Sequence, residues 1–151
     1  MPNLKKTKFL GSKSKIKNNP DNVILDFVKN PHPEFDYSIR LLSPEFTSIC
    51  PITSQPDFGT IVLDYIPSKI ILESKSFKLF LFSFRNYGGF HEDCTLKIAK
   101  KIIKFIKPKW LRIGGFWNPR GGIPIDIFFQ TGEKPKGVFV EDYKIKPYLG
   151  R

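Results

Sequence analysis

Alternating apolar and polar residues predict a β-strand over residues 58–66. One side of this segment carries Ile61, Leu63 and Tyr65, and the intervening positions are Thr60, Val62 and Asp64. A period of two is typical of a strand with one face more buried than the other, and Pro67 ends it. An earlier strand is predicted over residues 37–43. The prolines and polar residues of "PITSQPD" predict a loop between the two strands.

The apolar period becomes helical after residue 73. In "ESKSFKLFLFSFRN" the residues Phe77, Phe80, Leu81 and Phe84 recur at i, i+3, i+4 and i+7, which predicts an amphipathic helix. Two glycines in "YGGFHED" interrupt this pattern. A second apolar stripe then predicts another helix that ends before Pro108. Its members are Ile98, Ala99, Ile102, Ile103 and Ile106.

The C-terminal part returns to a period of two. "WLRIGGFW" and "IPIDIFF" flank "NPRGG", which predicts a hairpin with a glycine-rich turn. One face of its second strand carries Ile123, Ile125, Ile127 and Phe129. The order of two strands, two helices and two strands predicts an α+β fold, with an antiparallel sheet and both helices on one face.

Length and charge refine this picture. The 151 residues suit one domain, and 15 phenylalanines favour a folded chain. The formal net charge of the chain is +11. Six lysines precede residue 20, and no acidic residue lies among them, which predicts a basic, flexible arm over residues 1–20. The single domain is then expected over residues 21–151. No apolar run reaches the ~18 residues of a membrane span. With no signal-peptide pattern and two cysteines 44 positions apart, we expect a soluble, cytoplasmic protein.

Cys50 lies where the predicted first strand passes into the loop, and three roles are open to it. Cysteine is often a small buried residue, but this loop is polar and the carboxyl of Asp57 could fold back toward the thiol. A carboxylate raises the pKa of a thiol, so Asp57 suits a proton donor better than an activator, and activation would need lysines or a helix N-terminus. Zinc could bind Cys50, His91 and Cys94, although no zinc-binding spacing supports it.

"FHED", residues 90–93, precedes the second predicted helix. Asp93 is expected to cap that helix, which leaves Glu92 free. A glutamate can accept two parallel hydrogen bonds from the edge of a guanine-like base, and Phe90 offers a ring for stacking. These residue types suit a base-binding site or a plain helix start.

Three basic residues are candidates for binding phosphate. They are Lys75, Lys78 and Arg120, the last in a turn whose glycines let backbone amides approach an anion. A solvated basic face is the alternative. Neither GxGxxG nor GxxxxGK[ST] occurs, so the sequence supports neither a Rossmann nor a P-loop nucleotide site.

Four segments together resemble a known enzyme family. "EFTSICPITSQPDFGT", "ESKSFKLFLFSFRN", "FHEDC" and "PRGGI" are similar to the single-module NADPH-dependent 7-cyano-7-deazaguanine reductases of queuosine biosynthesis. The resemblance covers residues 45–126. It implies a tunnelling fold, in which subunits pool their sheets into barrel rings, and a homodecamer of two pentamers with active sites between subunits. It implies no membrane and no direct nucleic-acid partner.

The resemblance also implies roles for individual residues. Cys50 resembles the nucleophile that forms a covalent thioimide with the nitrile, and Asp57 resembles the proton donor. The positions that match substrate-binding residues are Leu72, Glu73, Ser74, Phe90, His91 and Glu92. The positions that match NADPH-binding residues are Lys75, Lys78 and Arg120, and no metal is implied. Cys94 could form a reversible disulfide with Cys50 that protects it from overoxidation.

Two other functions are compatible with the residues alone. A basic RNA-binding module would use the lysine-rich arm and aromatic side chains to hold single strands. A zinc-dependent, cyclohydrolase-like enzyme of the same fold would use the thiols as metal ligands.

Overall fold

The computed structural model describes residues 17–145. Of the predicted basic arm, residues 1–16 lie outside the described residues, as do residues 146–151. Within the described part, the first element is a short 3₁₀ helix, η1, over Pro20–Asn22.

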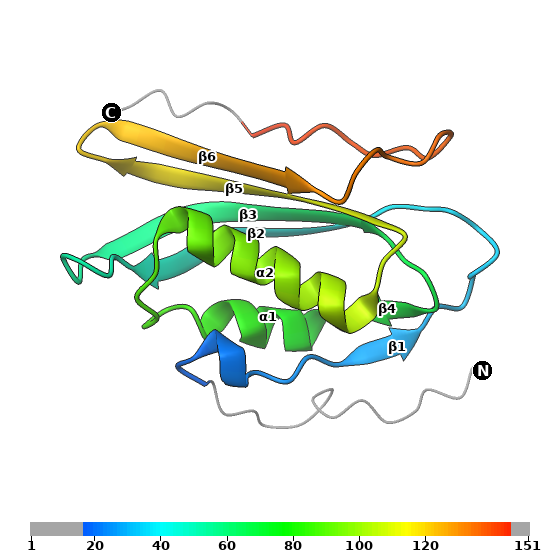
Figure 1. Ribbon diagram of the computed structural model, residues 1–151, viewed down its shortest axis with the longest axis horizontal. Coiled ribbons are helices and arrows are strands. Elements are labelled where there is room, and N and C mark those ends of the chain that lie inside the picture. The colour runs from blue at the N-terminus through cyan, green and yellow to red at the C-terminus, as the bar shows by residue number, and fades with distance from the viewer. Residues whose placement is uncertain (1–16, 146–151) are drawn as a thin grey trace.

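A four-stranded antiparallel sheet forms the centre of the molecule (Figure 1). Its strand order is β2-β3-β5-β6, with bounds Ile39–Ile49, Pro56–Ile66, Trp110–Arg120 and Ile123–Gln130. A second, two-stranded antiparallel sheet pairs β1, Phe27–Lys29, with β4, Ile70–Leu72. The predicted α+β class is confirmed, but the sequence pattern did not indicate the two short strands.

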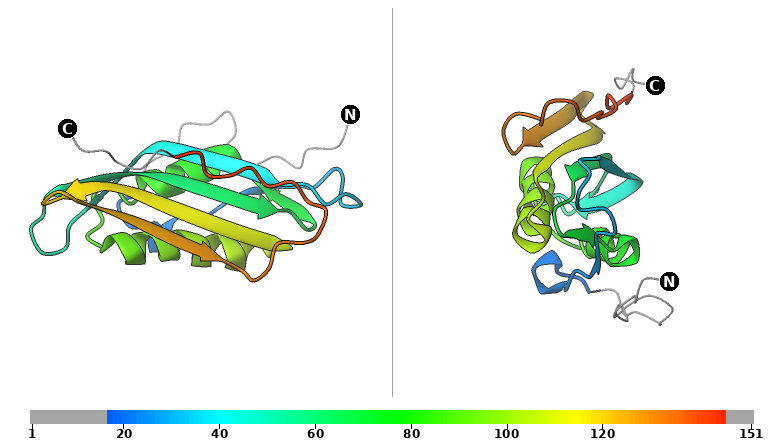
Figure 2. Two further views of the ribbon diagram at one scale, coloured as in Figure 1. Left: turned by 90° about the horizontal axis from the view of Figure 1, so that it is seen from above. Right: turned by 90° about the vertical axis from the view of Figure 1, so that its right-hand side faces the viewer.

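Both helices, α1 over Ser74–Phe82 and α2 over His91–Ile106, lie on one face of the large sheet (Figure 2). The predicted α1 stripe is confirmed, because Phe77, Phe80 and Leu81 are buried, with Phe84 just beyond the helix. The α2 stripe is buried at Ile98, Ala99, Ile102 and Ile106. Burial of these stripes against the sheet builds the main core.

The prediction that Asp93 caps α2 is wrong. The helix begins two residues earlier, at His91, and its cap residue is Phe90, whose side chain makes no capping bond. Asp93 instead lies in the first turn, where its negative charge interacts favourably with the positive end of the helix dipole. The prediction that this helix ends before Pro108 is confirmed, because α2 ends at Ile106 and Lys107 adopts the left-handed φ of 45°.

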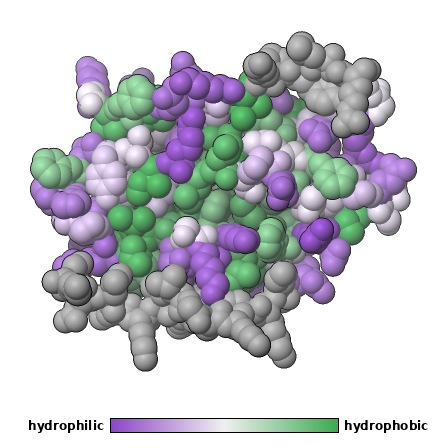
Figure 3. Space-filling model, turned by 180° about the vertical axis from the view of Figure 1, so that it is seen from behind, coloured by the Kyte–Doolittle hydropathy of each residue, from purple (hydrophilic) through white to green (hydrophobic). Residues whose placement is uncertain are grey.

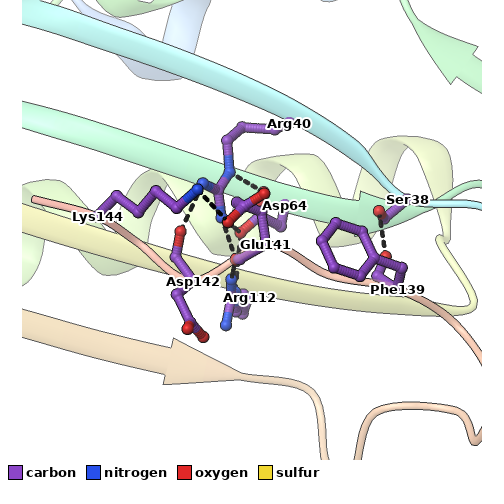
Figure 4. Close-up of polar contacts among 8 residues, drawn as sticks. All are labelled: Ser38, Arg40, Asp64, Arg112, Phe139, Glu141, Asp142 and Lys144. Atoms are coloured by element: carbon purple, nitrogen blue, oxygen red, sulfur yellow. Dashed lines mark hydrogen bonds and ion pairs between the residues drawn. The ribbon is translucent and has the colours of Figure 1, made fainter.

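Strand β3 is more deeply buried than its alternation predicts. Every residue from Ile61 to Ile66 is buried, including Asp64. The helices cover one face of the strand, and the C-terminal segment, residues 138–145, runs across the other (Figures 1 and 4). A polar residue of an alternating strand can therefore be buried when a distant segment returns over it.

Asp64 holds two arginines beneath that C-terminal segment (Figure 4). Its Oδ1 accepts from Arg40 Nε at 2.7 Å and its Oδ2 from Arg112 Nε at 2.8 Å. The guanidinium of Arg40 also donates to the carbonyl oxygens of Glu141 and Asp142. This ion cluster, centred on the buried Asp64 carboxylate, ties the segment to the sheet.

The C-terminal hairpin is confirmed, with a tighter turn than predicted. Strand β5 continues through Arg120, so only Gly121 and Gly122 form the turn, with φ of 60° and 82°. A non-glycine residue rarely adopts these angles. The turn therefore leaves Arg120 on the sheet, where its side chain has a fixed direction.

Large apolar side chains remain exposed on the isolated chain. Leu42 on edge strand β2 is 56% exposed, and Ile123 and Phe128 on edge strand β6 are 68% and 59% exposed. Figure 3 shows apolar surface in the middle of the face that includes β2. Apolar, unpaired sheet edges favour association with other strands.

Candidate active site

Cys50 is held at the tight turn that joins β2 to β3. Its backbone N–H donates to the carbonyl of Gln55 at 2.9 Å, and its own carbonyl accepts from the N–H of Ser54 at 3.0 Å. Ser54 adopts φ 56°, which turns the chain into β3. The backbone of Cys50 is therefore held at both its N–H and its carbonyl, and the residue is only 7% exposed.

The surroundings of Cys50 favour its thiolate. A hydrogen bond from the Thr53 hydroxyl, followed by contributions from the Thr53 amide, the Arg120 guanidinium and the Ile52 amide, lowers the pKa of Cys50 to about 6. The sequence led us to expect activation by lysines or a helix N-terminus. The groups in contact are instead a turn and an arginine from a distant strand.

Asp57 lies inside the same end of the sheet, with its side chain 2% exposed. Its Oδ1 is 3.2 Å from Nε of Arg120, and its Oδ2 is 3.3 Å from Nε2 of His91. Oδ1 is buried without a well-aligned hydrogen bond. The carboxyl group thus lies between the Arg120 guanidinium and the His91 imidazole, and the imidazole is a second group that can exchange a proton with it.

The imidazole of His91 is held in a fixed plane. It stacks on the indole of Trp117 with ring centroids 4.2 Å apart and planes 11° from parallel. Trp117 Nε1 donates to Oγ1 of Thr95 at 3.2 Å, and that hydroxyl donates to the His91 carbonyl at 2.8 Å. Stacking and hydrogen bonds together direct Nε2 of His91 at Asp57.

Phe90 and Glu92 flank His91 at the start of α2 and are exposed, Phe90 at 59%. Both are open to a ligand, one residue on either side of the His91 that contacts Asp57. The structure therefore brings six sequence-predicted site residues to one end of the sheet. They are Cys50, Asp57, Phe90, His91, Glu92 and Arg120.

The remaining predicted residues lie at the other end of the fold. Leu72 ends β4, and Ser74 begins α1 on the β4 side (Figure 1). Both carboxylate oxygens of Glu73 cap α1, accepting from the amides of Lys75 at 2.9 Å and Ser76 at 2.7 Å. A carboxylate has about four acceptor sites, so Glu73 can still accept from a ligand.

Lys75 and Lys78 lie on the outer side of α1, one helical turn apart. Lys75 is half-buried, whereas Lys78 is exposed with its Nζ 5.3 Å from the centre of the Phe82 ring. Arg120 is separated from them, because it lies at the Cys50 end of the sheet. One chain alone does not assemble these three basic residues into a single phosphate site.

Cys94 differs from Cys50 in its surroundings. It is fully buried, and this burial raises the pKa of its thiol to about 12, opposed by the nearby Ser48 hydroxyl. Both cysteines are free thiols. Within residues 17–145, Cys50, His91 and Cys94 do not form a metal-ligand cluster, and neither does any other group of three such residues. No helix in the same range could cross a membrane.

Sequence reasoning missed Thr53, Gln55 and Trp117. Thr53 follows Cys50 by three residues, a spacing that a one-turn loop brings into contact, so the turn-forming prolines were a usable signal. Trp117 lies on β5, far from His91 in sequence, and no local pattern relates the two. The packing of α2 against β5 places them together.

Comparisons with known proteins show the family of this chain. Residues 56–136 match the family model described as QueF-like protein. Proteins named NADPH-dependent 7-cyano-7-deazaguanine reductase include one from Rhodopseudomonas palustris, 61% identical over 87% of this chain and 84% of its own length. Another, from Parvibaculum lavamentivorans, is 54% identical over 98% of this chain and 96% of its own.

A solved structure shares the fold. The apo form of the archaeosine synthase QueF-Like superposes with a TM-score of 0.60 at 22% identity, covering 65% of this chain and 96% of that one. At this identity the likeness shows the fold alone. Identity above half over nearly the whole chain is decisive for the family: this chain belongs to the NADPH-dependent 7-cyano-7-deazaguanine reductases.

Proposed function

We propose that this chain reduces the nitrile of 7-cyano-7-deazaguanine to an aminomethyl group with NADPH, a step of queuosine biosynthesis. The observation that carries this proposal is the pairing of a thiolate-favouring Cys50 with a buried Asp57 that contacts His91. Nucleophile and proton donor are the two groups that nitrile reduction requires, because a nitrile alone is a poor hydride acceptor.

In the proposed first step, Cys50 Sγ adds to the nitrile carbon. The S–C bond forms, one π bond of the nitrile breaks, and its electron pair takes a proton from Asp57, which yields a thioimide. Two NADPH molecules would then supply two hydrides, one to the thioimide and one to the imine that follows it. Loss of the Cys50 thiolate from the reduced adduct leaves an imine, and Asp57 and His91 can return the protons that each reduction consumes.

Binding of the base is assigned to the start of α2. Glu92 is exposed there and can accept two hydrogen bonds from the edge of the deazaguanine, while Phe90 offers a stacking face. Lys75 and Lys78, one turn apart, fit phosphate oxygens of NADPH. Closure of the site around the imine must exclude water, which would hydrolyse it.

The division of predicted residues between two ends supports an assembly of several chains. Strands of 11 residues span about 35 Å. The Leu72 N–H donates to the hydroxyl of Tyr65, which lies near the far end of β3 from Asp57, so we propose that a second copy supplies Leu72, Glu73 and Ser74 to each Cys50. We propose the stacked pentamers of a tunnelling fold, joined through the apolar edge strands β2 and β6.

Activity and adduct formation test the reaction together. We expect two NADPH consumed per nitrile, measured by loss of absorbance, and a covalent adduct by intact mass that is absent in Cys50→Ala. Absence of an adduct in the unsubstituted enzyme would refute the covalent route.

Complementation tests the shared site. Cys50→Ala and Glu73→Ser each remove one side of the proposed shared site. Serine is chosen at position 73 because it can still cap α1. In co-assembled oligomers roughly a quarter of the sites should carry both intact halves if neighbours share each site. Activity no higher than that of the separate variants would contradict sharing.

A further inference from the structure

We propose that Thr53 and Arg120 are positioning residues that keep Cys50 ionised, with Arg120 acting both directly and through the Thr53 hydroxyl. This inference rests on the proposed function for its role in catalysis, but its physical content concerns the thiol alone. It assigns Arg120 a task beyond the phosphate binding that the resemblance implies.

The hydrogen bonds of Thr53 determine the direction of its proton. Its Oγ1 accepts from Nη2 of Arg120 at 2.8 Å and more weakly from the Gln55 N–H at 3.4 Å. A hydroxyl has two acceptor sites and one hydrogen, so both acceptor sites are used. The hydrogen is left for Cys50, whose sulfur is the acceptor beside it.

The backbone of the turn acts in the same direction. The bond from Ser54 N–H to the Cys50 carbonyl closes a single helix-like turn, and Pro51 has no N–H. The next two amides, of Ile52 and Thr53, therefore face the sulfur. Successive amides that converge in this way form an anion-binding nest.

Arg120 is fixed between the two reacting groups. Its Nη2 also donates to Oε1 of Gln55 at 2.8 Å, and its Nε lies 3.2 Å from Asp57. One guanidinium therefore neighbours both the Cys50 sulfur and the Asp57 carboxyl. It can stabilise the thiolate before addition and the carboxylate that remains after Asp57 has given its proton.

Ionisation of Cys50 requires only the loss of one proton. The Cys50 S–H bond loses its proton to solvent before substrate enters, and no electron is transferred. Nη1 of Arg120 has no hydrogen bond to a protein oxygen among the described contacts, so binding of an anion there remains compatible with this role.

The test is the pH dependence of Cys50 alkylation by iodoacetamide, with the label assigned by peptide mass analysis and no nucleotide present. The unsubstituted enzyme should titrate near the pKa of about 6. The single substitutions Thr53→Val and Arg120→Gln should each move the midpoint of this titration toward the ordinary pKa of a thiol. The rate of Cys50 alkylation at pH 6.5 should then fall roughly tenfold. Thr53→Ser keeps the hydroxyl and should titrate like the unsubstituted enzyme.

Arg85→Gln is the matched control for loss of one positive charge, since Arg85 is exposed. Unchanged midpoints in both Thr53→Val and Arg120→Gln would overturn the proposal, as would an equal shift in Arg85→Gln. Circular dichroism establishes that each variant is folded. Alkylation requires no turnover, so shifted midpoints in a protein that fails to reduce the nitrile would refute the proposed function while supporting this inference.

Discussion

Gly115 sets how closely α2 approaches the sheet behind His91. A Cβ built at this position would lie 2.5 Å from Oγ1 and 3.0 Å from Cγ2 of Thr95, and 3.1 Å from Nε1 of Trp117. The first distance is well inside van der Waals contact. Gly115→Ala must therefore displace Thr95 and with it the hydrogen bonds that position Trp117 and the His91 backbone.

We expect Gly115→Ala to lower the free energy of unfolding by about 1–3 kcal/mol, the usual cost of overpacking a core. For a chain of this size that corresponds to a fall in Tm of roughly 2–12 °C. Thr95→Ala alone should cost about 1–3 kcal/mol, because it leaves the buried Trp117 Nε1 without its acceptor. The double variant removes the clash, so it should cost about as much as Thr95→Ala alone.

Thermal unfolding followed by circular dichroism measures these differences. All variants are compared at one protein concentration, since association makes Tm concentration-dependent. Gly88→Ala is the control, because its Cβ would meet Pro51 at an ordinary 3.6 Å. Additive costs of the two substitutions in the double variant, or a Gly115→Ala protein as stable as Gly88→Ala, would refute this steric argument.

Three further predictions follow from the described contacts. Asp57→Asn removes the proposed donor, and we expect kcat to fall 10²–10⁴-fold while Cys50 still alkylates; unchanged kcat would exclude the role. Asp64→Ala removes the buried carboxylate between two partly buried guanidiniums, which keep only their bonds to backbone carbonyls. It should cost about 1–3 kcal/mol in urea unfolding, whereas Asp126→Ala, at an exposed site, should cost little; equal costs would contradict the cluster's role. The pKa of Cys94 is raised to about 12, so little of its thiolate is present at neutral pH. A protective disulfide between Cys94 and Cys50 should therefore form faster under mild peroxide as pH rises toward 9. Formation of sulfinic acid at Cys50 without a Cys50–Cys94 disulfide would exclude this protection.

Local periodicity predicted most of the secondary structure because each long element buries one face. The stripe of Phe77, Phe80 and Leu81 is an example, and so is the hairpin around Gly121. Strands β1 and β4 are three residues each, too short for a period to appear. The burial of Asp64 was not predictable either, since the segment that covers it follows some 75 positions later.

The start of α2 shows how a local rule fails where tertiary contacts compete with it. Asp93 is a good capping residue by type, yet the helix extends back to His91 with no side-chain cap. Packing of the imidazole on Trp117 and its contact with Asp57 favour the earlier start. Tertiary contacts at the site thus outweigh the capping preference.

Candidate residues were predictable from type and resemblance, but their grouping was not. Antiparallel topology brings three chain passages to one end of the sheet: the β2–β3 turn, the start of α2 and the end of β5. Arg120 connects them, because it contacts both the turn and Asp57. A sequence pattern can identify an arginine before two glycines, but only strand register places it beside the nucleophile. One guanidinium thus neighbours both the Cys50 sulfur and the Asp57 carboxyl group, and it reduces the repulsion between a thiolate and a carboxylate at these positions.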